Sequence, residues 1–422
     1  RQMCIRDSLA CFLHHPSDFY PMARILLIGA GGVANVIAVK AAQEPDTFSS
    51  LCIASRTREK CEKIAGRIKA ALPVNTAQVD ANNSASIASL IRSETASIVI
   101  NAALPEQNLP IMEACLEAGA HYIDTSAPEP VPGAYELFSY RWQLAYHDRF
   151  RAAGLTALLS IGFDPGVTNV FAAHLAGIFD QIQTIDIIDC NGGSHHRPFA
   201  TNFNPVTNLQ EVTQPSLWWE NDQWHEEPPF QTKKVFTLPD LGSCQLTRLY
   251  HEELETLVER INGLERAQVW MGLSEDYIQH VAVLSEIGLL SMNPVEHDGI
   301  PIAPLEFLSK TLPDPSTLGP DYTGKTNIGC LARGLMEGRE VTRYLYNLCD
   351  HEEAFAETGA HAVSYTAGVP PVVAAELLLS PHTDWNKPGV WVPEDLPTAP
   401  LLTRLAHRGL PWKLVDGDSL IA

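Results

Sequence analysis

Residues 24–34 read RILLIGAGGVA, an apolar run followed at once by closely spaced glycines. The run predicts a buried strand, the glycines a turn, and the residues after them the start of a helix. Gly29, Gly31 and Ala34 fit the spacing G-x-G-x-x-G/A. In that pattern the first residue permits the turn, the second lets backbone approach a pyrophosphate, and the third allows close helix–strand packing. Because the helix N-terminus also attracts phosphate, we expect a dinucleotide site formed by Gly29, Gly31, Gly32, Val33 and Ala34.

From this stretch onward, strand and helix patterns alternate. Such alternation predicts an α/β fold with a doubly wound parallel sheet, that is, a Rossmann domain. The expected strands are Arg24–Ile28, Ser50–Ser55, Val74–Val79, Ser97–Asn101, His121–Asp124 and Leu155–Ile161. The expected helices are Val33–Gln43, Glu59–Ala71, Ser84–Ser93 and Leu109–Ala118.

Past about residue 180 the pattern changes to an α+β mixture. Ile182–Cys190 alternates as a half-buried strand, and long aromatic, Pro-rich connections follow it. Further strands are expected at Lys233–Leu238, Ala267–Trp270 and Tyr344–Cys349, and helices at Glu252–Arg260, Asp276–Ile287 and Pro304–Lys310. The tail contains a small-residue helix, Pro370–Leu379, and a last apolar segment, Trp412–Val415.

The end of the second strand selects the cofactor. An NAD site places a carboxylate about 20 residues past the glycines, where it accepts hydrogen bonds from the ribose. This chain has Ser55, Arg56 and Thr57 there, and no acid. A guanidinium can fork onto a 2′-phosphate, and the hydroxyls can hydrogen-bond to it. These residues predict NADP(H), with the alternative that Arg56 only faces water at a strand end.

The carboxyl ends of the later strands should border the same crevice, because ligands of parallel sheets bind there. The lining residues expected from this rule are Asp80, Asn101, Ala102, Ala103, Leu104, Thr125, Ser126, Phe163, Pro165 and Gly166. Asp124 and Asp164 fall at strand ends near the expected reaction centre. Either one can alternatively be a structural helix cap.

One phosphate-binding motif lies in a sequence context that does not suit its function. Residues 319–326, GPDYTGKT, satisfy the phosphate-loop pattern G-x-x-x-x-G-K-[ST]. A phosphate loop follows a hydrophobic strand and opens a helix, whereas this segment follows a Pro-rich loop. Pro320 also removes an N–H from a loop that works through its N–H groups. We therefore expect no ATP site there.

Composition bounds the function further. The chain has 422 residues, 45% hydrophobic and 19% charged, as in globular proteins, and a net charge of −21. That charge argues against a nucleic-acid partner. Nine cysteines without a C-x-x-C pair indicate a reducing, cytoplasmic compartment. No apolar run approaches a membrane span, so no membrane partner is expected. Residues 1–21 read as a non-native or disordered leader, with Met22 as the expected start.

Two groups of charged residues lie in the second region. His195 and His196, near Cys190, match no standard zinc spacing, so we expect no metal. Residues 251–255, HEELE, and 350–353, DHEE, each follow an aromatic-apolar stretch. Such acids would suit a substrate ammonium group. The alternative is that they are the charged first turns of exposed helices.

The joint pattern resembles the saccharopine dehydrogenase-like family. Residues 27–33 (LIGAGGV), 54–57 (ASRT), 122–125 (YIDT) and 162–169 (GFDPGVTN) carry this likeness. Within the family, the chain is most similar to the branch of carboxynorspermidine-forming dehydrogenases. That closer likeness rests on residues 187–193, 198–205, 249–255, 324–330, 347–351 and 385–390, and the whole resemblance covers 23–415. Ala34 stands where many relatives have glycine.

The resemblance implies a reaction and a domain plan. NADPH would reduce the imine formed from L-aspartate 4-semialdehyde and 1,3-diaminopropane, or putrescine. The implied plan is a Rossmann domain of residues 22–178 and 361–422, with residues 179–360 inserted for substrate binding and homodimer formation.

Site roles follow from that chemistry. Hydride transfer to an iminium needs nearby carboxylates that stabilise positive charge and relay a proton, for which we expect Asp124 and Asp164. Arg197, Thr201 and Asn202 are the candidates for the substrate α-carboxylate, and Asn191 is expected among the substrate-binding residues. Glu252, Glu253 and Asp350 are the candidates for the distal ammonium.

Two alternatives remain at this point. A related enzyme that forms saccharopine or another opine would carry the same glycine turn. A protein that only senses NADP, without turnover, would also carry a Rossmann fold, because the fold alone does not decide function.

Overall fold

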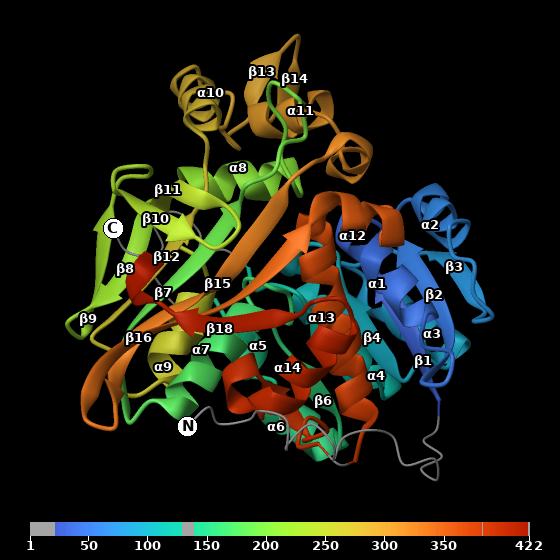
Figure 1. The fold of residues 1–422 in the computed structure, drawn as a ribbon. Coiled ribbons are helices and arrows are strands. Elements are labelled where there is room, and N and C mark those ends of the chain that lie inside the picture. Colours follow the sequence, from blue (N-terminus) through green and yellow to red (C-terminus); the bar gives the residue numbers. More distant parts are fainter. Residues whose placement is uncertain (1–21, 129–138, 382, 421–422) are drawn as a thin grey trace.

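The computed structural model of the chain describes residues 22–128, 139–381 and 383–420. The expectation for residues 1–21 therefore lies outside the described residues. Figure 1 shows two large sheets, a parallel one built mainly from the blue and teal N-terminal segments and a mixed one built from green, yellow and orange segments and the red strand β18.

The parallel sheet confirms the predicted α/β Rossmann class. Its strand order is β17-β6-β5-β4-β1-β2-β3, and all its pairings are parallel. The strands are β1 (Ala23–Ile28), β2 (Phe48–Ser55), β3 (Val74–Gln78), β4 (Ile98–Asn101), β5 (His121–Asp124), β6 (Thr156–Leu158) and β17 (Gly389–Trp391).

Helices cover both faces of this sheet because its strands are apolar on both sides. In β1, Ile25 and Leu27 belong to one buried cluster, and Leu26 and Ile28 to a second on the opposite face. The helices are α1 (Gly32–Ala42), α2 (Arg58–Ala65), α3 (Ser84–Glu94), α4 (Asn108–Ala118), α5 (Arg141–Leu144), α6 (His147–Ala153), α7 (Val167–Ile178), α12 (His351–Thr358), α13 (Ala362–Leu379) and α14 (Thr398–His407).

The second sheet has nine strands. Its main path is β10-β11-β12-β7-β15-β16-β18, with β8 on β12 and β9 on β8. The strands are β7 (Gln181–Asn191), β8 (Ser216–Glu220), β9 (Gln223–Glu227), β10 (Lys233–Leu238), β11 (Gly242–Leu249), β12 (Arg266–Met271), β15 (Lys325–Met336), β16 (Arg339–Asp350) and β18 (Trp412–Asp416). β7 turns Ile185 and Ile187 toward the cluster that also contains α7 and α13, so this face meets the Rossmann part.

Two further helices pack beside this sheet, and a small unit projects from it. α8 (Pro205–Thr213) and α9 (Glu253–Arg260) lie against the sheet. The projecting unit, at the top of Figure 1, comprises α10 (Glu275–Glu286), the hairpin β13 (Val295–His297) and β14 (Ile300–Ile302), and α11 (Pro304–Thr311). Short 3-10 helices are η2 (Pro105–Gln107), η3 (Pro315–Thr317), η4 (Gly319–Asp321), η5 (Pro393–Asp395) and η6 (Asp418–Leu420).

Several expectations need correction. The helix expected to reach Ala71 ends at Ala65, and the tail helix begins at Ala362 although it contains Pro370 and Pro371. We placed residues 361–422 in the Rossmann part, but β18 pairs with β16 of the second sheet. These three errors arise because tertiary packing decides where marginal segments go.

The expectation that no apolar segment is as long as a membrane span also needs correction, because of helix α13. Within the described residues, it is long and apolar enough to cross a membrane, with a mean hydropathy of 1.4 over 18 residues. However, 83% of that window is buried inside the fold. Gly368 explains its tight packing on α1, because a Cβ there would lie 2.6 Å from Cβ of Val36. The helix therefore has the surroundings of a core helix.

Candidate active site

The glycine turn has the geometry that a pyrophosphate site needs. Gly29 has a φ of +124°, and a Cβ there would lie 2.4 Å from the carbonyl oxygen of Ala102, so only glycine fits. Gly31 is the N-cap of α1, and a Cβ there would meet nothing within 4 Å. A Cβ on Gly32 would lie 2.4 Å from Oγ of Ser364 in α13. The turn thus combines a forced glycine with open space in front of a helix N-terminus.

The third position of the motif has a packing role. Ala34 is fully buried in α1 and belongs to the cluster that joins this helix to β1. Val33 is partly buried against the same cluster. Ala34 therefore provides the close helix–strand approach that the motif requires, without glycine.

Arg56 is available for a 2′-phosphate. Its side chain is exposed directly after β2, and within the described chain its guanidinium forms no hydrogen bond or ion pair. The backbone N–H of Thr57 donates to Oγ of Ser55 at 3.2 Å, which fixes the turn that carries Arg56. An unpaired guanidinium held at this strand end fits an NADP site.

A chain of amides crosses the carboxyl edge of the sheet from β4 to β5. Nδ2 of Asn101 donates to Oδ1 of Asn108 at 2.7 Å, and Nδ2 of Asn108 donates to Oε1 of Gln143 at 3.3 Å. Nε2 of Gln143 donates to Oδ2 of Asp124 at 2.6 Å, and the N–H of Ser160 donates to Oδ1 of Asp124. Both oxygens of Asp124 therefore have internal partners, and burial raises its pKa to about 7. These contacts favour the structural alternative for Asp124.

Most of the other predicted lining residues lie along this edge. The N–H groups of Ala102 and Ala103 bond to Ile28 and Asn101, and the carbonyl of Ser126 accepts from Asn108. Phe163 is instead buried against Phe171, and Asp80 is exposed and bonded to Asn82. The positions found at the edge are Asn101, Ala102, Ala103, Leu104, Thr125, Ser126, Pro165 and Gly166.

An acidic cluster lies where the two sheets meet. We define it as Asp164, Asp189, Glu211, Glu252 and Glu253 around His251. The three glutamates and His251 are all buried. Among the described residues, no Lys or Arg pairs with any of these carboxyls. Glu252 accepts from the N–H of Ala127 at 3.3 Å, which joins the cluster to the loop after β5.

His251 is the single basic side chain in the acidic cluster. Its Nδ1 is hydrogen-bonded to Glu253 and lies 3.4 Å from Oε2 of Glu252, and its Nε2 lies 3.8 Å from Oε1 of Glu211. Burial alone would lower the pKa of His251, but the charges of Glu253, Glu252 and Glu211 raise it well above its usual value. His251 is therefore held as an imidazolium.

Burial also raises the pKa values of Asp164, Asp189 and Glu252, and it raises the pKa of Glu211 to about 7. Oε1 of Glu211 and Oε1 of Glu253 are buried and have no hydrogen-bond partner in the described structure. Leaving such acceptors unsatisfied costs about 1–3 kcal/mol each. The acidic cluster thus contains buried acceptors that a cationic group can satisfy.

A polar relay continues from the acidic cluster along β7. Asp189 and Asn191 share one face of the strand. Nε2 of His351 bonds to Oδ1 of Asn191, Nδ2 of Asn191 donates to the hydroxyl of Tyr322 at 2.7 Å, and that hydroxyl donates to Oδ1 of Asn202 at 2.8 Å. The Tyr322 and His351 rings stack with centroids 3.8 Å apart. Among the described residues, this relay engages Oδ1 of Asn202 and leaves its Nδ2 without a partner.

The remaining predicted substrate residues are dispersed. Arg197 is 52% exposed and lies 3.8 Å from Asp321, and the buried Thr201 donates to the carbonyl of Phe203. Asp350 caps α12 by accepting from the N–H groups of Glu352 and Glu353. Asp350 is thus engaged as a cap, whereas Glu252 and Glu253 lie in the acidic cluster.

Sequence reasoning gave no role to Asp189, Glu211 or His251. Asp189 carried a usable signal, because it places a charge on the otherwise apolar face formed by Ile185 and Ile187. Glu211 carried no such signal. In the sequence it follows Asn208 by about one helical turn, and two polar residues at that spacing are typical of the exposed face of a helix.

His251, Glu252 and Glu253 offer ligand atoms within 4.8 Å of one another, so a metal ion is geometrically feasible there. Nδ1 of His251 already bonds to Glu253, so one of the possible ligand atoms is engaged within the cluster. The expectation of no metal stays a prediction.

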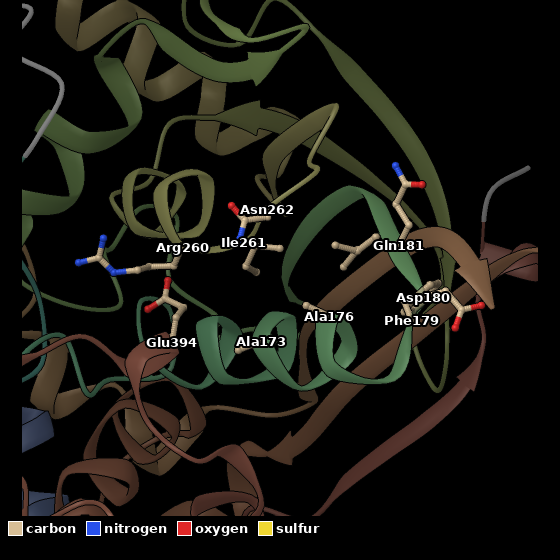
Figure 2. A pocket seen from close by; sticks show the side chains of 10 residues that line it. Ala173, Ala176, Phe179, Asp180, Gln181, Arg260, Ile261, Asn262 and Glu394 are labelled. Atoms are coloured by element: carbon tan, nitrogen blue, oxygen red, sulfur yellow. The ribbon is translucent and has the colours of Figure 1, made fainter. Parts of the chain in front are cut away.

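A cavity of about 360 Å³ lies elsewhere, at the C-terminal end of α7 (Figure 2). Figure 2 shows Ala173 and Ala176 on that helix, with Arg260 and Glu394 at one side and Asp180 at the helix end. Asp164 precedes the opposite end of α7, and no member of the acidic cluster lines the cavity. We therefore treat the acidic cluster, rather than this cavity, as the candidate active site.

Fold and site together define an NADP-dependent oxidoreductase whose second sheet supplies the charged groups. Comparison with known proteins narrows this class. Residues 25–158 match the saccharopine dehydrogenase NADP binding domain, and residues 162–410 match the saccharopine dehydrogenase C-terminal domain. The chain belongs to the saccharopine dehydrogenase family, which confirms the resemblance and the NADP(H) cofactor.

Named relatives cover nearly the whole chain. It is 44% identical over 398 residues to carboxyaminopropylagmatine dehydrogenase from Synechocystis sp., covering 94% of this chain and 98% of the relative. It is 40% identical over 408 residues to carboxynorspermidine synthase from Vibrio cholerae, covering 93% of this chain and 97% of that relative. Apo saccharopine dehydrogenase (L-Glu forming) from Saccharomyces cerevisiae shares the fold, with a TM-score of 0.66 at 14% identity, covering 93% of this chain and 100% of that one.

Proposed function

We propose that the protein uses NADPH to join L-aspartate 4-semialdehyde to an amine that carries a second cation. The products are carboxynorspermidine from 1,3-diaminopropane and carboxyspermidine from putrescine. The observation that carries this proposal is the acidic cluster, in which five carboxyls surround one imidazolium and, within the described residues, pair with no Lys or Arg. The names of the relatives, which refer to carboxylated polyamines, support the same class of product.

The distal cation of the amine pairs with Glu211 and Glu253. An ammonium group has three N–H donors and no acceptor. The unpartnered oxygens of these two glutamates can each accept one of them. Charge-assisted hydrogen bonds of this kind contribute about 1.5–3 kcal/mol each. Selection for a dication then follows from the need to neutralise buried carboxylates.

The relay along β7 orients the other substrate. With Oδ1 of Asn202 accepting from Tyr322, the Nδ2 of Asn202 donates to the α-carboxylate of the semialdehyde. Arg197 is exposed in the same connection, three residues after Ser194, whose N–H bonds to Thr323. Its exposed guanidinium, only 3.8 Å from Asp321, can turn to add a second contact.

NADPH held at Gly29–Ala34 and Arg56 supplies the hydride. The chain itself binds and orients the two substrates, and Glu252, anchored to Ala127, places negative charge beside the edge where the iminium forms. Asp124 stabilises the loop after β6 through Ser160. The electrostatic preference for a cation at this edge favours the iminium over its neutral precursors.

Agmatine in place of the diamine is the second candidate, because the Synechocystis relative at 44% identity is named for an agmatine compound. A guanidinium forks onto carboxylates bidentately. The imidazolium of His251 lies between Glu211 on one side and Glu252 and Glu253 on the other. The same acids could therefore accept either terminus.

The test is NADPH consumption, followed by absorbance, with aspartate semialdehyde and a panel of amines: 1,3-diaminopropane, putrescine, agmatine, lysine, glutamate and propylamine. We expect turnover with amines that carry a second cation and little with propylamine. Preference for lysine or glutamate would indicate a saccharopine-type or opine-forming enzyme instead. NADPH binding without consumption for any amine would indicate a sensor and contradict the proposal.

We further propose that the protein is a homodimer and that residues 179–360 form the substrate and dimerisation domain. Light scattering after size exclusion checks the first point. A monomer mass of 46.3 kDa would contradict it.

A further inference from the structure

Two carboxyls of the acidic cluster, Asp164 and Asp189, are hydrogen-bonded to each other. Asp164 belongs to the loop that follows β6, at the carboxyl edge of the Rossmann sheet, and Asp189 belongs to β7 of the second sheet. The pair therefore bridges the two sheets at the point where cofactor and substrate must meet.

Both aspartates stand on rigid backbone. The loop of Asp164 is closely packed, because a Cβ on Gly162 would lie 2.8 Å from the carbonyl oxygen of Thr125, and the N–H of Gly166 donates to Asn169 at 2.8 Å. Asp189 lies in a strand that is paired on both sides, with Met271 of β12 and Ile328 of β15 opposite it. A geometry fixed from both sides suits a group that must meet a reacting atom.

Two hydrogen-bonded carboxyls must hold a proton between them. Burial and the negative charges of Asp189 and Glu253 raise the pKa of Asp164, while the imidazolium of His251 opposes this shift. The charged groups that face the pair come from the segment that opens α9, from the first residue of α9 and from α8: they are His251, Glu253 and Glu211. With so many acids present, one shared proton is the stable state of the pair.

We propose that Asp164 and Asp189 form a proton-sharing pair that takes protons from the substrate amine and gives them to the departing carbinolamine oxygen. This inference rests on the proposed function. Asp189 then becomes a catalytic residue beside Asp164. Asp124, expected earlier in the same role, has both oxygens committed to Ser160 and Gln143.

The proton balance needs only this pair. The pair accepts one proton from R–NH3+, and the free amine attacks the aldehyde carbon, so that a C–N bond forms and the carbonyl π electrons move to oxygen. The pair returns that proton to the oxygen, accepts a second from nitrogen, and gives it to the hydroxyl, which leaves as water. The sum is R–NH3+ plus O=CH–R′ giving R–NH+=CH–R′ plus water, with the pair unchanged. NADPH, supplied by the proposed function, then reduces the iminium.

The test compares D164N, D189N and the double variant with D186N. Asp186 lies on the same strand but on the opposite face, where it bonds to Arg266 and Trp270, so its substitution controls for loss of a buried carboxylate from β7. Removing a proton relay lowers kcat by a hundredfold to ten-thousandfold. We expect that loss in each single variant, no further loss in the double variant, and nearly normal kcat in D186N.

Isotope effects separate a relay from a merely structural role. In D164N and D189N, imine formation becomes limiting, so the effect of 4-deuterated NADPH on kcat falls toward one while the solvent deuterium effect rises. A full effect of deuterated NADPH on a reduced kcat would show that hydride transfer itself was damaged, and would overturn the proposal. Additive losses in the double variant would also overturn it.

A second readout needs no turnover. Infrared difference spectra at neutral pH, wild type minus D189N and wild type minus D164N, should each show loss of one protonated carboxyl signal, whereas wild type minus D186N should not. Unchanged carboxyl signals in both variants would exclude the shared proton.

An inactive wild type that still shows the signal would instead count against the proposed function. The two aspartates come from different elements, so a folding defect in one variant leaves the other as the test.

Discussion

Nε2 of His251 lies 3.8 Å from Oε1 of Glu211, an oxygen that is buried and has no hydrogen-bond partner in the described structure. This contact joins α8 to the segment that opens α9, and the proposed function makes this oxygen an acceptor for the substrate cation. E211Q should therefore raise KM for the amine about tenfold to hundredfold, equivalent to roughly 1.5–3 kcal/mol. KM for NADPH should not change. E259Q, at the exposed end of α9, is the control, and an unchanged amine KM in E211Q would remove Glu211 from the site.

The same residue predicts how amine affinity depends on pH. Burial raises the pKa of Glu211 to about 7, so much of it is protonated below that pH, whereas the bound cation needs the ionised form. Amine binding should release protons and tighten as pH rises from about 5 to 8. Calorimetry in two buffers of different ionisation enthalpy measures the release. The dependence should weaken in E211Q, and affinity that is flat with pH would contradict this role.

Substitutions at two glycines of the cofactor turn should have different effects, one on NADPH binding and the other on stability. A Cβ at Gly31 meets nothing within 4 Å, so G31A should unfold at nearly the wild-type temperature and yet bind NADPH at least tenfold more weakly. G29A should instead lower the unfolding temperature, because its Cβ would meet Ala102. Thermal unfolding with and without NADPH measures both effects. Normal NADPH affinity in G31A would place the pyrophosphate elsewhere.

Arg56 should set the preference for NADPH over NADH. R56A should raise KM for NADPH by about ten- to a hundredfold and leave KM for NADH nearly unchanged, because only NADPH carries the 2′-phosphate. R58A is the matched control, since Arg58 is exposed two residues away and pairs with Glu62. Equal losses for both cofactors in R56A would point to a structural role.

Glu394 should make the protein less stable as pH rises. Oε1 of Glu394 accepts from Asn169 and Thr256, while Oε2 is buried and has no hydrogen-bond partner within the part of the chain that the structure describes. Burial raises the pKa of Glu394 to about 7. The folded state therefore holds this proton more tightly than the unfolded state, where the pKa is near 4.5. The associated stability is present below pH 4.5 and is lost as pH rises to about 7, an effect on the order of 1–3 kcal/mol. E394Q should flatten the unfolding free energy between pH 5 and 8, and a steeper slope would contradict this sign.

The cofactor half of the molecule was predictable from sequence because its signals are local. The apolar run before Gly29, the spacing to Ala34 and the missing acid near Arg56 each depend on a few neighbouring residues. Nothing comparable marks the acidic cluster, because Asp164, Glu211 and His251 are distant in sequence. Contacts among the loop after β6, α8 and the segment that opens α9 bring them together. Asp350, in an equally acidic segment, is used as a helix cap instead, and only tertiary structure distinguishes it from Glu253.

The most direct test of the account follows the hydride into the product. Wild-type enzyme supplied with 4-deuterated NADPH, aspartate semialdehyde and 1,3-diaminopropane should give a carboxylated polyamine one mass unit heavier than the unlabelled product. Mass spectrometry with fragmentation should place the deuterium on the carbon that was the aldehyde carbon, beside the new secondary amine. If no amine in the panel gives a labelled condensation product, or if the label appears only in a reduced alcohol, the protein does not reduce an imine and the central claim is wrong.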